Sequence, residues 1–160
     1  MKKLNKNGFT LVELLAVIVI LAVVILVAVN NVIPQMNKAK AGAFKTEALS
    51  FLDGAEQYYT SQQMTGGSFP ADGVSIGELV TGKYVKSADV DKYKGCIKYN
   101  EATQKFSIKL YSSSYMTVDP ENASNLFVEA TTLSNFDGVV GDSTVIRTAD
   151  TSKANDYNCK

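Results

Sequence analysis

An unbroken apolar run near the N-terminus dominates the pattern of hydrophobic and polar positions. Residues 14–29 read LLAVIVILAVVILVAV and contain no polar side chain. Extended back to Phe9, a helix over residues 9–29 would be about 32 Å long at about 1.5 Å per residue, enough to cross the hydrocarbon core of a bilayer. The pattern therefore predicts a transmembrane helix over residues 9–29, and one glutamate, Glu13, lies inside it.

Helical periodicity continues beyond the apolar run, but on one face only. Apolar side chains recur at helical spacing as a single stripe: Phe44, Ala48, Phe51, Ala55 and Tyr59. This predicts a helix to about residue 61 whose second half packs on a globular head while its first half protrudes. Between the halves, Pro34 removes a backbone hydrogen bond and Gly42 lowers helix propensity, so we predict a helix kink or weak segment there.

Residues 62–160 are predicted to form one small β-rich head, which gives the chain an α+β fold. The stretch GCIKYNEATQKFSIKLYSS alternates apolar and polar positions about a short turn, which predicts a hairpin with one face on the helix. Ser75 and Glu78 have the spacing of a capping box at a short helix that Gly82 would end. STVIRT, residues 143–148, predicts a strand, whereas residues 120–130 fit either a helix or a loop.

Composition removes several classes of function. The chain has 160 residues, no histidine, and 16 basic against 16 acidic residues. Three of its lysines lie in the first eight residues, so residues 9–160 carry 13 basic and 16 acidic residues, a net charge of −3. No basic patch interleaved with aromatic residues supports nucleic-acid binding. Histidine is the commonest general base and metal ligand. Because the chain has none, we expect that it is not an enzyme and that it has no metal or cofactor site.

The chain has two cysteines, Cys96 and Cys159, with neither CxxC spacing nor a third metal ligand. In a chain with a membrane or export segment, such a pair favours one disulfide in an oxidising compartment. Two buried free thiols are the alternative. A bridge would close a loop of about 64 residues, which the chain-entropy model values at roughly 4 kcal/mol.

The N-terminus differs from a secretory signal peptide, because no Ala-x-Ala site follows the apolar run and the small residue Gly8 precedes it. A short lysine-bearing leader that ends in Gly8, then FTLVE, then an apolar run, resembles the type IV pilin-like prepilins. The resemblance covers about the first 60 residues in detail. It implies the type IV pilin fold: a leader over residues 1–8, a long helix over residues 9–61, and a head over residues 62–160 built on a small antiparallel sheet.

The resemblance also implies a site at the start of the apolar run. A prepilin peptidase would cut between Gly8 and Phe9, and the new amine of Phe9 would be N-methylated. Glu13 lies one helical turn from that amine, so the two charges could neutralise each other within one subunit. Between neighbouring subunits, the same pair would set their register. The alternative for Glu13 is an interfacial glutamate that snorkels to the membrane surface.

The function implied by the resemblance is structural: the major subunit of a type IV pilus. The precursor would be a single-pass membrane protein with a cytoplasmic N-terminus. After cleavage it would polymerise through its helix into an extracellular filament, or fimbrium, for adhesion or twitching motility. Its partners would be copies of itself, the prepilin peptidase, the assembly platform with its ATPase, and membrane lipid before assembly; a surface receptor stays undefined.

Two other classes compete with a major pilin. A pseudopilin of a type II secretion or competence DNA-uptake system, or a minor pilin, would share the same N-terminal pattern. A membrane-anchored binding or hydrolytic module would need a nucleophile with a base, paired carboxylates or a metal cluster in the head. The sequence of the head shows no such set at recognisable spacing.

Overall fold

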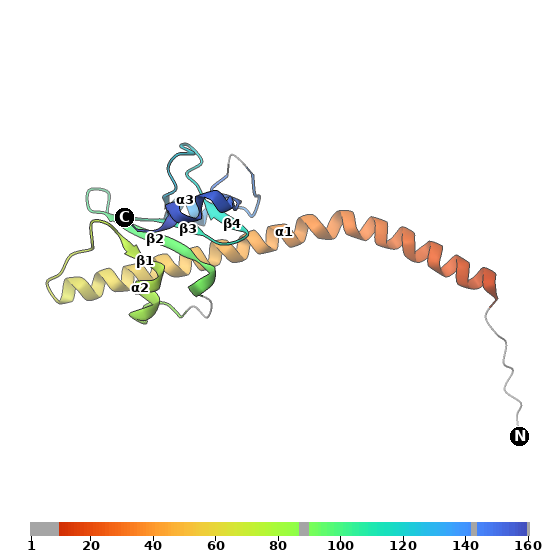
Figure 1. Cartoon of the computed structure of the whole chain (residues 1–160), viewed down its shortest axis with the longest axis horizontal. Coiled ribbons are helices and arrows are strands. Elements are labelled where there is room, and N and C mark those ends of the chain that lie inside the picture. The colour runs from red at the N-terminus through yellow and green to blue at the C-terminus, as the bar shows by residue number, and fades with distance from the viewer. Residues whose placement is uncertain (1–9, 87–89, 142–143, 160) are drawn as a thin grey trace, which may run out of the picture. The chain divides into compact units, whose positions relative to one another are not determined.

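The structure is a computed structural model that describes residues 10–86, 90–141 and 144–159. Contacts divide the chain into two units, residues 1–37 and residues 38–160. Helix α1, Leu11–Met64, contributes its N-terminal part to the first unit and the rest to the second, which holds all other elements (Figure 1).

In the first unit, α1 exposes the whole apolar run. All large apolar side chains from Leu11 to Met36 are exposed, from 44% at Val29 to 82% at Leu11. By length and composition, this is a helix that could cross a membrane. The helix continues without a break through Pro34 and Gly42. The kink expected there stays a prediction.

Two asparagines at the end of the apolar run bond back to their own helix. Asn30 Nδ2 donates to Leu26 O at 3.2 Å, and Asn31 Nδ2 donates to Val27 O at 3.0 Å. Each carboxamide therefore uses a carbonyl of the preceding helical turn as its acceptor. One side-chain donor of each asparagine is therefore bonded within the same helix.

In the second unit, α1 buries the predicted apolar stripe against the sheet. Phe44, Ala48, Phe51 and Ala55 are at most 3% exposed, and Tyr59 is partly buried beside them. The same core contains strand residues such as Ile97, Ile108 and Leu110. The apolar stripe is confirmed, and α1 itself continues to Met64, three residues past the expected end.

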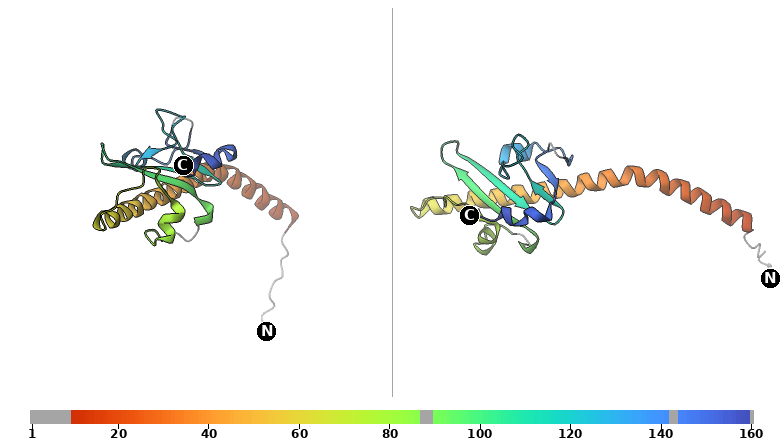
Figure 2. Two further views of the ribbon diagram at one scale, coloured as in Figure 1. Left: turned by 60° about the vertical axis from the view of Figure 1, so that its left-hand side comes forward. Right: turned by 45° about the horizontal axis from the view of Figure 1, so that its top comes forward.

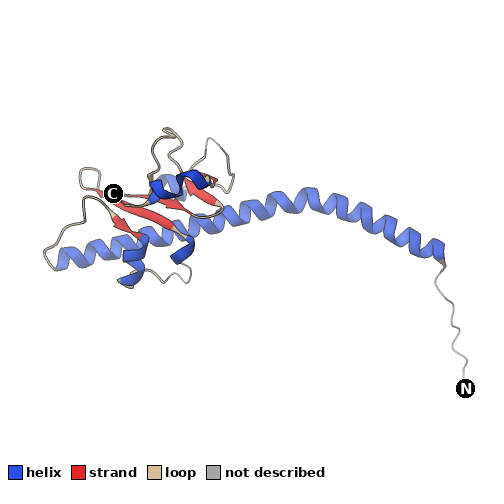
Figure 3. Cartoon of the chain, viewed as in Figure 1, coloured by secondary structure: helices blue, strands red, loops and turns tan. Residues whose placement is uncertain are grey.

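The sheet has six strands with antiparallel pairings, in the order β1-β2-β3-β4-β6 with β5 beside β3. Figure 3 draws the strands in red. The strands are β1 Val74–Ser75, β2 Lys94–Asn100, β3 Lys105–Tyr111, β4 Tyr115–Thr117, β5 Val128–Glu129 and β6 Ile146–Thr148. The other elements are helices α2 Ile76–Thr81 and α3 Ala130–Ser134, and 3-10 helices η1 Val90–Lys92 and η2 Thr151–Tyr157. A long helix on an antiparallel sheet confirms the α+β, pilin-like fold predicted above.

Two contacts fix what lies on each flank of α1 in the second unit. On one flank Gly54 faces the segment after α2, and a Cβ at this position would lie 3.2 Å from the Tyr84 carbonyl oxygen and collide with Val85. Glycine permits this close approach because it has no Cβ. On the other flank Lys45 Nζ donates to Ser134 O at 2.6 Å, at the end of α3. Figures 1 and 2 show α2 and α3 on these opposite sides.

Local predictions in the head are confirmed where they rest on short-range spacing. The hairpin is β2–β3, with Asn100 paired to Lys105 across the turn. The Ser75 hydroxyl accepts from Glu78 N, and the Glu78 carboxylate accepts from Ser75 N, which completes the capping box of α2. Gly82 is the C-cap of α2 in an ordinary right-handed conformation.

Three local features are settled by the structure and not by simple pattern reasoning. After Gly82 the left-handed conformation falls on Lys83, with φ of 63°. Residues 120–127 form a loop, and α3 begins only at Ala130. Lys109, on the polar side of the β3 alternation, is 8% exposed and its Nζ donates to Asp156 O at 2.7 Å. The alternate face of β3 is therefore covered by the C-terminal segment.

That C-terminal segment forms a second, smaller core. Tyr157 of η2 is fully buried with Tyr111, Met116 and Val118. Its hydroxyl donates to Thr117 O at 2.7 Å, and burial raises the pKa of the phenol. Just beyond η2, Cys159 forms a disulfide with Cys96 of β2, which confirms the predicted bridge. The tail is thus held by a covalent bond, a buried ring and backbone contacts.

Candidate functional site at the start of the apolar helix

The first turn of α1 is closed by a side-chain cap between Thr10 and Glu13. Glu13 Oε2 accepts hydrogen bonds from Thr10 N at 2.9 Å and from Thr10 Oγ1 at 2.8 Å. Glu13 N approaches Thr10 Oγ1 at 3.4 Å, which gives the two-way arrangement of a capping box. The glutamate inside the apolar run therefore has a partner within its own chain.

The cap uses one carboxylate oxygen of Glu13 and leaves the other available. In residues 10–86, 90–141 and 144–159, no hydrogen bond reaches Glu13 Oε1. Thr10 and the first turn of α1 are exposed, so a cationic group from outside this turn has access to the carboxylate. An anion at a helix N-terminus also interacts favourably with the helix dipole. The helix terminus therefore favours the ionised carboxylate, whose second oxygen is the atom that a cation from outside this turn would approach.

The other predicted members of this site, Gly8 and Phe9, lie outside the described residues. Thr10, by contrast, is a site residue that the sequence interpretation missed. The available signal was its T-x-x-E spacing to Glu13, the same spacing that predicts the cap of α2 at Ser75.

The structure joins one predicted pair, Cys96 and Cys159, and gives Glu13 a partner, Thr10, that the sequence did not lead us to expect. Cys96 and Cys159 are bonded in the head, and Glu13 is bonded to Thr10 in the first unit. Pro34 and Gly42 lie inside α1 and take part in neither pair.

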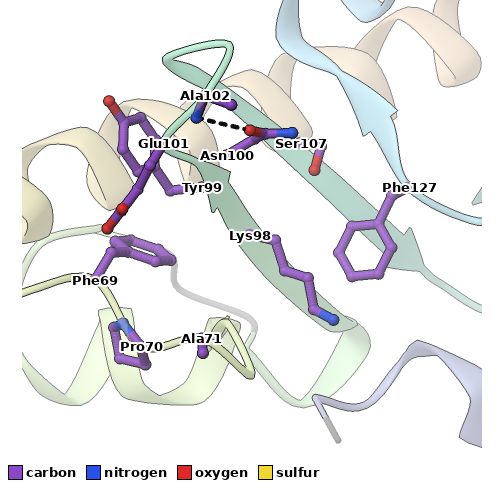
Figure 4. A pocket seen from close by; sticks show the side chains of 10 residues that line it. All are labelled: Phe69, Pro70, Ala71, Lys98, Tyr99, Asn100, Glu101, Ala102, Ser107 and Phe127. Carbon is purple, nitrogen blue, oxygen red and sulfur yellow. Dashed lines mark hydrogen bonds between the residues drawn. The ribbon is translucent and has the colours of Figure 1, made fainter.

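The head contains an open hollow of about 680 Å³ beside the end of β2 (Figure 4). Lys98 extends toward Phe127, with its Nζ 5.2 Å from the ring centroid, and Phe69 and Pro70 form the opposite side. The Asn100 side-chain oxygen turns into its own hairpin and accepts from Ala102 N at 3.0 Å. Lys98 and Ser107 both line the hollow and are paired across β2 and β3, but no hydrogen bond joins their side chains among the residues that the structure describes.

Comparison with known proteins points to the N-terminus. Residues 3–29 match the family described as the prokaryotic N-terminal methylation motif. The matched stretch includes Gly8, Phe9, Thr10 and Glu13, and it extends to the end of the apolar run. Searches of curated proteins and of solved structures found no match to the chain.

Proposed function

We propose that this chain, a type IV pilin-like protein with the N-terminal methylation motif, is the major subunit of a type IV pilus. Proteins of this kind are structural subunits rather than enzymes, and a prepilin peptidase processes them before assembly. Assembly into a filament is favoured by one observation above all: α1 exposes its large apolar side chains from Leu11 to Met36.

An exposed apolar helix of this length must be covered by apolar surroundings both in the membrane-bound precursor and in the mature subunit outside the bilayer. In the precursor, lipid would surround residues 9–29, with the N-terminus in the cytoplasm. Outside the bilayer, the same side chains would lose contact with water only by packing on other apolar helices. Identical subunits related by a non-closing contact would then form a filament. The disulfide of the head is consistent with an oxidising, extracellular location.

The site at Glu13 would serve both stages. In the precursor, Thr10 bonds one carboxylate oxygen and caps the helix. After cleavage, the methylated amine of Phe9 from the same or a neighbouring subunit would bond the other oxygen. Within an apolar bundle, such a pair would stabilise one axial register of neighbouring helices relative to shifted registers. Setting the register is the best-attested use of a buried polar contact.

The mature protein is expected to begin at Phe9 and to carry a methyl group on its amine. The motif match spans the Gly8–Phe9 bond, and an extended glycine fits a protease cleft at low steric cost. Intact-mass measurement of protein sheared from the cell surface decides this. A mass that retains residues 1–8 would contradict it, and Gly8→Leu is the variant expected to accumulate the uncleaved precursor.

The major-pilin assignment is tested by imaging cells that lack this protein. Long surface filaments are expected to disappear and to return when the gene is supplied on a plasmid. If filaments persist and a secretion or DNA-uptake activity is lost instead, the chain is a pseudopilin. If filaments persist at reduced number, it is a minor pilin.

A further inference from the structure

Two acidic side chains stand together on the exposed face of α1 without a described counterion. Asp53 and Glu56 are both exposed and three residues apart, so they are neighbours on the helix surface. Within the described residues, neither forms an ion pair. Like charges that neighbour each other on a helix surface repel and disfavour the helix. A cation from outside the subunit would remove that repulsion.

A shallow hollow of about 220 Å³ lies beside this pair. Its walls include Leu52, Phe106 and Ala130 in addition to the two acidic residues. Lys105 also lines it, but its ammonium is held by Glu129 at 2.8 Å. An apolar wall next to two carboxylates suits a lysine side chain, whose alkyl stem packs on apolar surface while its ammonium reaches the charges.

The opposite flank of α1 presents suitable cations at the same level of the helix. Lys83 and Lys86 are exposed, and neither forms an ion pair within the described residues. They bracket the segment Tyr84–Val85, which packs directly on Gly54. Gly54 itself lies between Asp53 and Glu56 in the sequence, so the basic and acidic flanks border one turn of α1.

We infer that Lys83 and Lys86 of one subunit dock on Asp53 and Glu56 of a second copy of this chain. The inference rests on the proposed filament, because parallel copies arranged around a common axis would present one flank to the opposite flank of the next. The contact is head-to-tail around the axis, so an acidic face stays free at one end of a row of subunits and a basic face at the other. It therefore propagates rather than closing into a dimer.

Charge exchange tests this contact in the full chain. The Asp53→Lys, Glu56→Lys double variant and the Lys83→Glu, Lys86→Glu double variant are each expected to lower filament yield about tenfold or more, because like charges then meet at every interface. The variant that carries all four substitutions is expected to restore filaments to near the wild-type yield. Glu121→Lys and Lys153→Glu, two exposed charge reversals elsewhere on the head, are the matched controls and should assemble normally.

Covalent trapping gives an independent measurement. Cells that co-express Glu56→Cys and Lys83→Cys chains should form an intersubunit disulfide in sheared filaments, seen as a dimer on a non-reducing gel. Either single-cysteine chain alone should not form it. Normal filaments from both double reversals, or no recovery in the fourfold variant when its cleaved subunit is present in membranes, would overturn the inference. A failure of the pilus assignment would give a different result: wild-type cells would carry no filaments whose formation requires this chain.

Discussion

Replacing Glu13 by Ala is expected to abolish surface filaments while membrane insertion and leader removal continue. Insertion should be unimpaired, since an ionisable group in a transmembrane segment opposes insertion by roughly 2.5 to 3.5 kcal/mol at mid-membrane. Assembly should fail because the Phe9 amine would be left without its anion in an apolar bundle. Loss of one partner of a buried pair costs roughly 3 to 5 kcal/mol, and here the loss recurs at every subunit.

Two companion variants separate the charge of Glu13 from its capping bonds. Glu13→Gln keeps an oxygen that can accept from Thr10 but has no charge, and it is expected to fail in assembly like Glu13→Ala. Thr10→Val removes the hydroxyl from the cap but keeps the charge; it should weaken the first turn by about 1 kcal/mol and retain most filaments. Filament yield is measured beside the amount of cleaved subunit in membranes. Normal filaments from both Glu13 variants would show that the carboxylate is only interfacial.

Removal of the disulfide is expected to be the most destabilising change in the head. The bond joins residues 63 apart in sequence, so the Cys96→Ser, Cys159→Ser variant should lose roughly 4 kcal/mol of unfolding free energy in the chain-entropy model. The tail should then become more susceptible to proteolysis, because η2 would be held by noncovalent contacts alone, such as the buried Tyr157 ring and the bond from Lys109 to Asp156 O. Chemical denaturation of the detergent-solubilised full chain, followed by circular dichroism, gives the midpoint.

Tyr157→Phe is the matched control for that measurement. It deletes the hydrogen bond to Thr117 O but keeps the buried ring and the disulfide, so its cost should be about 1 kcal/mol. An equal denaturation midpoint for the double serine variant and the wild type would contradict a stabilising role for the bridge.

The features that the sequence predicts correctly are those that depend on a few residues close together in the chain. The stripe from Phe44 to Ala55 and the Ser75–Glu78 cap both follow from helical spacing, which any window of one or two turns contains. The T-x-x-E spacing of Thr10 and Glu13 follows the same rule, although Glu13 is most conspicuous as a charge in an apolar run.

The features that escaped prediction depend on distant parts of the chain. Lys109 is buried because Asp156, 47 residues later, folds over it, and no local pattern near β3 carries that information. Gly54 occupies a helix interior where propensity disfavours glycine, and its reason lies in the Tyr84–Val85 segment. Phe9 and Gly8 lie outside the described residues, so their roles stay predictions.

The back-bonded asparagines bear on how this helix could move between lipid and protein. A polar group whose partner is solvent or a headgroup must exchange that partner when its surroundings change, and the exchange adds a barrier. Asn30 and Asn31 instead carry their acceptors with them, on Leu26 and Val27 one turn earlier. One donor bond of each asparagine can therefore persist when this end of the helix passes from a bilayer to a bundle of helices or back. These two bonds add no exchange barrier to the transfer in either direction.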